Sequence, residues 1–445
     1  MQFPVSSLKC LTLLLAALGL CGAAQAQTAA QAPTLSAAKG LNFADYLSAV
    51  ERHSPDLQSQ QQNVVSAQAG VGIAGIRPDP QLSLGAAREQ VRTGLPRPLN
   101  RTYELSMELE TGGKRSARIR AARSQVRLAE AGVEGFRTQL FSDAALDFTQ
   151  ACRDHQALER KEQTLRALSD VVKANEVRRK AGDIGTVEWR QSRVERDQFQ
   201  ADVTQARADA QASRLALSVP LGRKLSEVFG SEELQCDFQP FANGKSIDSL
   251  VAQALKVRSD VRVAQATLEN ARDNAGVALA NRWVNPTLAV GLTAVPATSA
   301  GVDAQGAAFD AGNRSRMLSV SVSMPIPFSR LNRGEVLQAE AAVTQAMLGL
   351  QQSQHKAEAD VRSAYFRFAA ARENVERYRS NVLADAQRVL ESIRLSYRHG
   401  QASLLELLSA QRSADDAYLG YLQADADLAK ATVDLQLSIG QRPAL

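Results

Sequence analysis

The sequence predicts a membrane protein of mixed α and β structure that is built from two copies of one unit. Three observations support this fold class. The chain repeats itself after about 218 positions. Each half contains a pair of short segments in which apolar and polar residues alternate. Each half also contains long helical segments rich in alanine, glutamine, arginine and leucine.

The repeat is clearest at two sharp turns between long helices. Gly182 in the first half corresponds to Gly400 in the second. About six residues later, Glu188 corresponds to Glu406. Glycine tolerates the left-handed backbone of a tight turn, so we expect these two glycines to turn the hairpins. The expected divisions are a signal peptide at 1–26, a flexible lead at 27–40, a first repeat at 41–222, a connector at 223–246 and a second repeat at 247–445.

Residues 1–26 have the features of a secretory signal peptide. Lys9 supplies a positive charge, Cys10–Gly22 an apolar core, and Ala24–Ala26 a cleavage site with small residues. Cys21 is not expected to carry a lipid, because a bulky leucine stands where lipoprotein signals have a small residue. No later segment has the roughly 18–20 apolar residues that a membrane-spanning helix needs.

Strands are expected at about 80–111 in the first half and at about 286–326 in the second. Strict alternation in Thr102–Thr111 places two kinds of residue on opposite faces: Tyr103, Leu105, Met107 and Leu109 against Glu104, Ser106, Glu108 and Glu110. Such strands suit a membrane barrel with lipid outside and a wet lumen, or an amphipathic hairpin on a soluble core. The alternation of apolar residues with serines in Leu318–Met324 favours the barrel.

Four strands cannot close a barrel by themselves. Closure needs roughly eight strands. An open edge in lipid leaves backbone groups unpaired, at a cost of several kcal/mol each. If these strands span a membrane, the protein must therefore oligomerise.

Long helical hairpins are expected at about 114–222 and 330–440. Between Val343 and Val389 apolar residues recur at alternating spacings of four and three, which is the repeat of a coiled-coil seam. Alanines flank the seam, which suggests helices that contact neighbours on two sides, as the staves of a tube would. A plain antiparallel coiled coil is the alternative.

Two motifs resemble a known family. Tyr397–Arg412, YRHGQASLLELLSAQR, together with Leu435–Gly440 resembles the last hairpin of the TolC family, the outer-membrane channels of tripartite efflux and type I secretion systems. Glu110–Arg115, ETGGKR, resembles the junction found in the branch that serves cobalt–zinc–cadmium exporters.

The resemblance implies a homotrimer in the outer membrane of a Gram-negative bacterium, with a large periplasmic part. Its sheets would form one twelve-stranded β-barrel, continued by a long α-helical barrel. The channel would be passive and would receive divalent heavy metals from an inner-membrane pump of the resistance–nodulation–division (RND) type through a periplasmic adaptor. Alternatives are a drug-efflux or type I secretion channel of the same fold, a periplasmic adaptor, or a coiled-coil scaffold.

The two turns form the candidate functional site. In the resembling family they lie at the periplasmic end of the tube, where acidic residues surround a constriction. Glu188 and Glu406 fall on acidic positions of this kind. Ser409 stands at a second position that is acidic in the family, and Ala402 stands where a basic residue locks the aperture.

Carboxylates that converge on an axis would repel one another, raise one another's pKa values and favour cations. Arg193 and Arg412 also follow the turns and could offset the repulsion by pairing with these acids. The alternative is that both glutamates belong only to a solvated helix face.

Cys152 and Cys236 are the cysteines that follow the signal peptide. They could form a disulfide in an oxidising compartment or remain two inert thiols, and the sequence alone favours the thiols.

The remaining chemistry of the sequence is sparse. It contains no P-loop, H-E-x-x-H or G-x-S-x-G motif, so we expect no enzyme and no cofactor. The four histidines lie far apart, so no metal site is visible. The net charge of +5 is mild and no basic cluster is interleaved with aromatic residues, so nucleic acid is not an expected partner.

Overall fold

A computed structural model describes residues 41–88, 98–230, 233–238, 241, 244–302, 306–326 and 333–445. Its compact unit is Gly40–Leu445, and the other unit, Met1–Lys39, contains no described residue. The expected signal peptide and flexible lead therefore lie outside the described residues.

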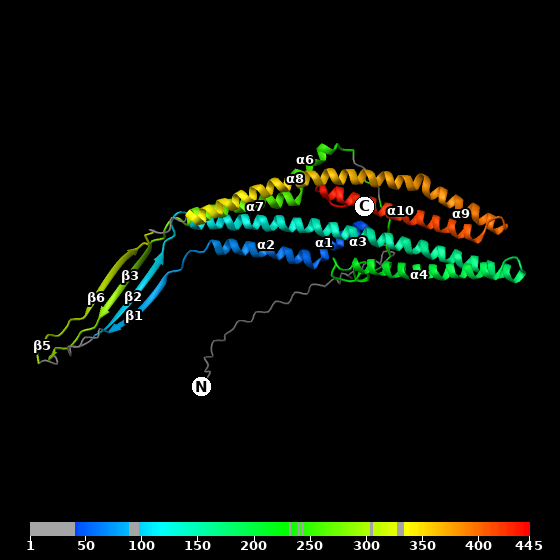
Figure 1. Cartoon of the computed structure of the whole chain (residues 1–445). Helices are drawn as coiled ribbons and strands as arrows, with labels where there is room; N and C mark the ends of the chain where they lie inside the picture. The colour runs from blue at the N-terminus through cyan, green and yellow to red at the C-terminus, as the bar shows by residue number, and fades with distance from the viewer. Residues whose placement is uncertain are drawn as a thin grey trace, which may run out of the picture. The chain divides into compact units, whose positions relative to one another are not determined.

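The first half contains two short helices, two strands and a long helical hairpin (Figure 1). The side chains of Asn42 and Ser54 cap the first two helices by accepting hydrogen bonds from the following turn. The bounds are α1 Phe43–His53, α2 Pro55–Ala74, β1 Gln81–Arg88, β2 Leu99–Glu108, α3 Lys114–Ala181, α4 Thr186–Ala216 and, in the connector, α5 Leu225–Phe229.

The second half has the same element order with two additions, the small β4–β5 hairpin and the π-helix η1. The π-helix η1 lies between α8 and α9 in the second long hairpin, where the hydroxyl of Tyr378 lies close to Gly420. The bounds are α6 Ile247–Val257, α7 Ser259–Ala280, β3 Thr287–Val295, β4 Gly301–Val302, β5 Ala308–Phe309, β6 Ser315–Ser323, α8 Arg333–Arg377, η1 Tyr378–Val382, α9 Leu383–Arg398 and α10 Leu404–Ser438.

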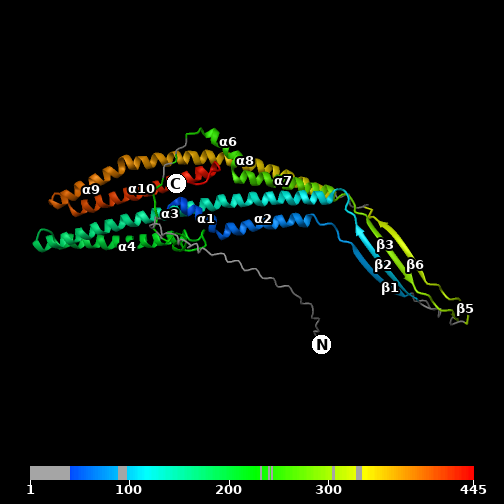
Figure 2. The same cartoon turned by 180° about the vertical axis from the view of Figure 1, so that it is seen from behind.

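The helices of the two halves pack side by side. Helix α3 contacts α2 and α7 toward the sheet, and it contacts α4 and α10 toward the hairpin turns (Figure 2). The sheet and the turns therefore lie at opposite ends of α3. None of the described helices is both long and apolar enough to cross a membrane.

The four long strands form one antiparallel sheet in the order β1-β2-β3-β6. Their register aligns apolar side chains in rows on one side, here called the apolar face. Its rows are Leu82, Leu105, Val290 and Val320; Leu84, Tyr103, Leu292 and Leu318; and Met107, Leu288 and Val322. The opposite, polar face carries residues such as Ser83, Glu104, Gly291 and Ser319.

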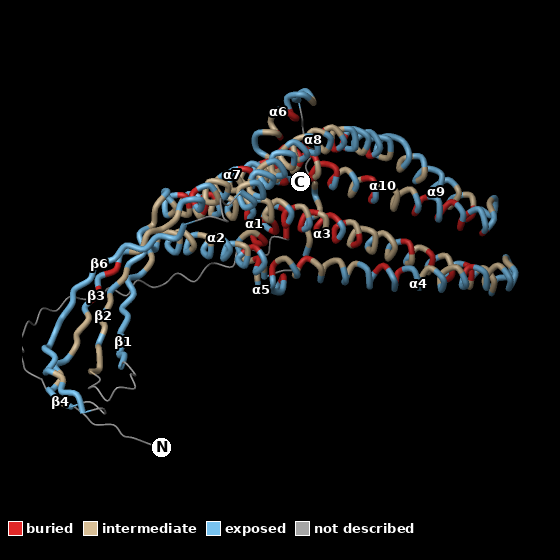
Figure 3. The backbone as a smooth tube through the Cα atoms, turned by 60° about the vertical axis from the view of Figure 1, so that its left-hand side comes forward, coloured by how far each residue is buried: buried red, intermediate tan, exposed pale blue. Residues whose placement is uncertain are grey.

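The largest group of buried apolar residues lies where α1 packs on α3. The ring of Phe148 lies 5.5 Å from that of Phe43 and 5.6 Å from that of Tyr46, measured between centroids. Burial is concentrated on the facing sides of the helices, whereas the sheet is largely exposed (Figure 3). The helical part thus has apolar cores of its own, whereas no residue of the described strands belongs to them.

A disulfide joins the connector to this core. Cys152 on α3 is bonded to Cys236, with their Cα atoms 5.5 Å apart. The preference for two free thiols is therefore wrong. The reason lies in nearby backbone pairing: Leu41 forms a parallel bridge with Leu234, which holds the connector beside the core.

The hexapeptide Glu110–Arg115 builds the junction between β2 and α3. Gly112 has φ 65°, and a Cβ atom there would lie 2.4 Å from the ring of Trp283, so the close contact requires glycine. The Lys114 ammonium donates a hydrogen bond of 2.8 Å to Oδ1 of Asn285. Trp283 and Asn285 both precede β3 in the second half, so contacts of this motif join the two halves.

Candidate functional site

Both hairpin turns contain a glycine in the left-handed region. Gly182 has φ 87° and Gly400 has φ 74°, which is the conformation expected at these turns. At each turn the residue after the glycine donates a backbone hydrogen bond to a carbonyl five positions earlier, at 2.9 and 2.8 Å. These bonds satisfy carbonyls that the end of a helix leaves free.

Glu406 stabilises the start of α10. Its carboxylate accepts hydrogen bonds from the backbone N–H of Ser403 at 2.7 Å and from the Ser403 hydroxyl at 2.9 Å. These two bonds lower the pKa of Glu406, and the bond from the backbone has the larger effect. The expected rise in its pKa depends on carboxylates of several copies that converge on an axis, so it stays a prediction. The S-x-x-E capping signature in the sequence could have indicated this role.

Glu188 is held by the other hairpin. The hydroxyl oxygen of Tyr397 on α9 lies 3.2 Å from Glu188 Oε1 on α4 and 2.7 Å from Asn175 Oδ1 on α3. Tyr397 and Asn175 are both buried, and burial raises the pKa of the Tyr397 phenol. One tyrosine therefore connects both hairpins near their turns. The sequence placed Tyr397 in a motif but could not show partners more than 200 residues away.

The two other positions named from the sequence carry no charge. Ser409 is exposed on α10. Ala402 is partly buried and packs against the apolar cluster that contains Tyr397 and Leu404. Within the described ranges, no group of three or more histidine, cysteine, aspartate or glutamate residues could hold a metal ion.

The arginines after the turns have partners other than the candidate glutamates. Arg412 Nε donates a hydrogen bond of 2.9 Å to Glu195 on α4. The guanidinium of Arg193 lies 5.0 Å from the ring centroid of Trp189, and that of Arg179 lies 4.8 Å from the same centroid. Among the described residues neither arginine forms an ion pair with Glu188 or Glu406, so the expected pairing is not found within one chain.

A buried polar cluster joins α3 to α10 farther from the turns. Asp415 is only 6% exposed and accepts hydrogen bonds from Arg160 at 2.9 Å, Thr164 at 2.8 Å and Gln411 at 3.3 Å. Breaking such a pair leaves a buried charge uncompensated at about 3–5 kcal/mol, so the cluster sets the position of α10 on α3. Sequence reasoning missed it because Asp415 lies about 250 residues from Arg160 and Thr164.

The comparison with protein families decides the assignment. The model of the family described as outer membrane efflux protein matches residues 46–223 and 250–441, one segment in each half. The chain belongs to this family. One relative of the chain is the cobalt-zinc-cadmium resistance protein CzcC of Cupriavidus metallidurans. It is 22% identical over 409 residues, which cover 92% of this chain and 89% of CzcC.

Solved channel structures have the same fold. CusC matches with a TM-score of 0.70 and 19% identity, covering 92% of this chain and 96% of its own. The CmeC outer membrane channel of Campylobacter jejuni matches with a TM-score of 0.71 and 17% identity, covering 90% of this chain and 86% of its own. The predicted mixed α and β channel fold and the resemblance to TolC-family efflux channels are confirmed.

Proposed function

We propose that the chain forms a homotrimeric, passive exit channel in the outer membrane of a Gram-negative bacterium, and that its cargo is divalent heavy-metal cations. An inner-membrane RND transporter would deliver the cations through a periplasmic adaptor. The family match supports the channel, and the similarity to CzcC supports the cargo. A conduit of this kind needs no catalytic residues and no cofactor.

The observation that carries the proposal is the exposed apolar face of the sheet. Leu82, Leu105 and Val320 share one row and are 66, 53 and 67% exposed. A soluble protein rarely exposes an apolar patch that crosses four strands. The opposite face, with Glu104 and Ser319, is polar. Both features, the exposed apolar face and the polar opposite face, are expected if the apolar face contacts lipid and the polar face lines a lumen.

The free edges of the sheet support a trimer. Strands β1 and β6 each pair on one side only among the described residues. They run in opposite directions, so β6 of one copy can pair with β1 of the next in the antiparallel manner already present. Three four-stranded sheets would then close without an edge.

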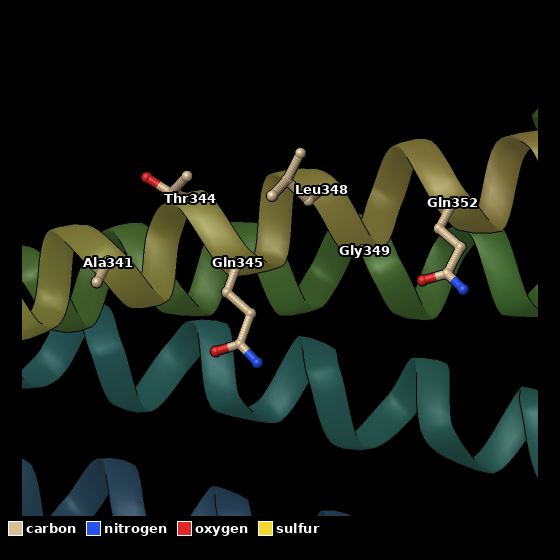
Figure 4. A pocket seen from close by; sticks show the side chains of 6 residues that line it. All are labelled: Ala341, Thr344, Gln345, Leu348, Gly349 and Gln352. Carbon is tan, nitrogen blue, oxygen red and sulfur yellow. The ribbon is translucent and has the colours of Figure 1, made fainter.

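The helices offer a second contact face for a neighbouring copy. An open groove of about 700 Å³ runs along α8 (Figure 4), and the residues that line it are small or uncharged: Ala341, Thr344, Gln345, Leu348, Gly349 and Gln352. Small residues let helices approach closely, so this face suits the helix of an adjacent protomer.

Growth of a deletion strain tests the cargo. Loss of the gene should increase sensitivity to Zn²⁺, Co²⁺ and Cd²⁺, and the intact gene should restore tolerance. Unchanged metal tolerance with increased drug sensitivity would instead indicate a drug channel. Loss of a secreted protein alone would indicate a type I secretion channel. Fractionation of the complemented strain should place a trimer in the outer membrane, and recovery in the soluble periplasm would refute the channel.

A further inference from the structure

Three arginines lie on the apolar face of the sheet, at the end of the strands that is farthest from the helices. Arg101 and Arg316 share a row, with Ala294 between them and Ala86 on the other side of Arg101. Arg88 points to the same face one alternate position farther along β1. All three arginines are exposed.

The charges on the two faces of the sheet have opposite signs. On the polar face the charged residues of the described strands are Glu104 and Glu108. None of Arg88, Arg101 and Arg316 forms an ion pair within the part of the chain that the structure describes. The three arginines therefore present unneutralised positive charge beside the apolar rows rather than in the lumen.

The distance between the helix junction and these three arginines is close to the thickness of the apolar part of a membrane. From Leu109, beside the helix junction, to Arg101 the chain covers about 27 Å at about 3.4 Å per residue. A strand tilt of about 40° reduces this to a height of about 20 Å, close to the apolar band of about 25 Å in outer-membrane barrels. At the end of the sheet next to the helices, Trp283 is 65% exposed, as an aromatic residue at a membrane surface would be. The arginines then lie at the opposite, outer surface.

We propose that Arg88, Arg101 and Arg316 bind the phosphate groups of an anionic glycolipid in the outer leaflet. This inference rests on the proposed outer-membrane location. Guanidinium groups bind phosphate oxygens in a bidentate manner, and their long side chains reach from an apolar surface to polar headgroups. Ala86 and Ala294 flank Arg101 and leave room for phosphates between the cations. The apolar rows beside them contact the acyl chains.

Lipid binding by the reconstituted protein tests the proposal. The full chain is placed in phosphatidylcholine nanodiscs that contain bisphosphorylated lipid A, and retained lipid A is measured by native mass spectrometry. An arginine near an anionic lipid surface contributes about fivefold in affinity. Replacing all three arginines with glutamine should therefore weaken retention by about 100-fold. Lipid A without its phosphates should bind equally weakly to the parent and to the variant.

A matched control removes the same charge elsewhere. Arg166, Arg190 and Arg223 are exposed, lie outside the sheet and form no ion pair among the described residues, so glutamine there should leave retention unchanged. Equal retention by the parent and the sheet variant, or an equal loss in the control, would overturn the proposal. Displacement of lipid A by millimolar inorganic phosphate would also overturn it, in favour of a free-anion site. Failure of the parent to enter nanodiscs would count against the membrane channel itself.

Discussion

Replacing Tyr397 with phenylalanine should favour separation of the two hairpins near their turns. The phenol oxygen lies 2.7 Å from Asn175 Oδ1 and 3.2 Å from Glu188 Oε1, so it connects α9 to both helices of the first hairpin. Phenylalanine keeps the ring, over which Arg178 lies at 5.3 Å, and removes only the hydroxyl. Because Asn175 is fully buried, its carbonyl oxygen would lose a partner without gaining water.

The size of the effect follows from the number of copies. A hydrogen bond between neutral side chains contributes about 1 kcal/mol net. If three such bonds break together in a trimer, the joined state loses about 3 kcal/mol. The ratio of separated to joined turns should then rise by about 150-fold.

Conductance of the trimer in planar bilayers measures this change. Tyr397→Phe should lengthen the open state. Tyr418→Phe is the matched control, because that hydroxyl has no hydrogen-bond partner among the described residues while its ring lies 5.0 Å from the Arg160 guanidinium. An unchanged open state in Tyr397→Phe, at the parent's trimer yield, would refute the idea that this hydroxyl holds the hairpins together.

Three further changes test other parts of the structure. Val320→Arg on the apolar face should impair membrane assembly by about 2–4 kcal/mol, whereas Ser321→Arg on the polar face should not; trimer yield in membranes measures both, and equal tolerance would contradict the lipid-facing assignment. Cys152→Ser should destabilise the protein by about 4.5 kcal/mol, because the disulfide joins residues 84 positions apart; unfolding with and without reductant measures this, and two free thiols in the unreduced, unfolded protein would contradict the bond. Glu406→Gln should remove an acid-dependent loss of stability. The folded pKa of Glu406 is lowered, so its carboxylate stabilises the fold above an unfolded pKa of about 4.3 and this contribution is lost as the pH falls through the folded pKa; urea unfolding at several pH values should show a steeper acid decline for the parent than for the variant.

Much of the fold could be predicted because its signals are local. Strict alternation in Thr102–Thr111 predicted a strand, which the structure places at Leu99–Glu108. The first long hairpin was expected to begin at about residue 114, and its first helix extends from Lys114 to Ala181. These patterns depend on which residues lie two, three or four positions apart, and that information is present in any short window.

The contacts at the candidate site could not be predicted, because they join residues that are far apart in the chain. Nothing near Tyr397 indicates that its hydroxyl reaches Asn175, 222 positions earlier. The fit of Trp283 against Gly112 likewise depends on how the two halves are placed. The capping role of Glu406 differs, since its partner Ser403 is three residues away and the signature could be read directly.

The two glutamates that follow the turns differ in their contacts. Equivalent glutamates have different roles in the two halves, because Glu188 contacts the opposite hairpin whereas Glu406 caps its own helix. The hydrogen bonds that Glu406 accepts from Ser403 lower its pKa. Its charge is partly compensated by the N-terminus of α10. An ionised but compensated carboxylate attracts a cation weakly, and a channel that must release its cargo requires weak binding.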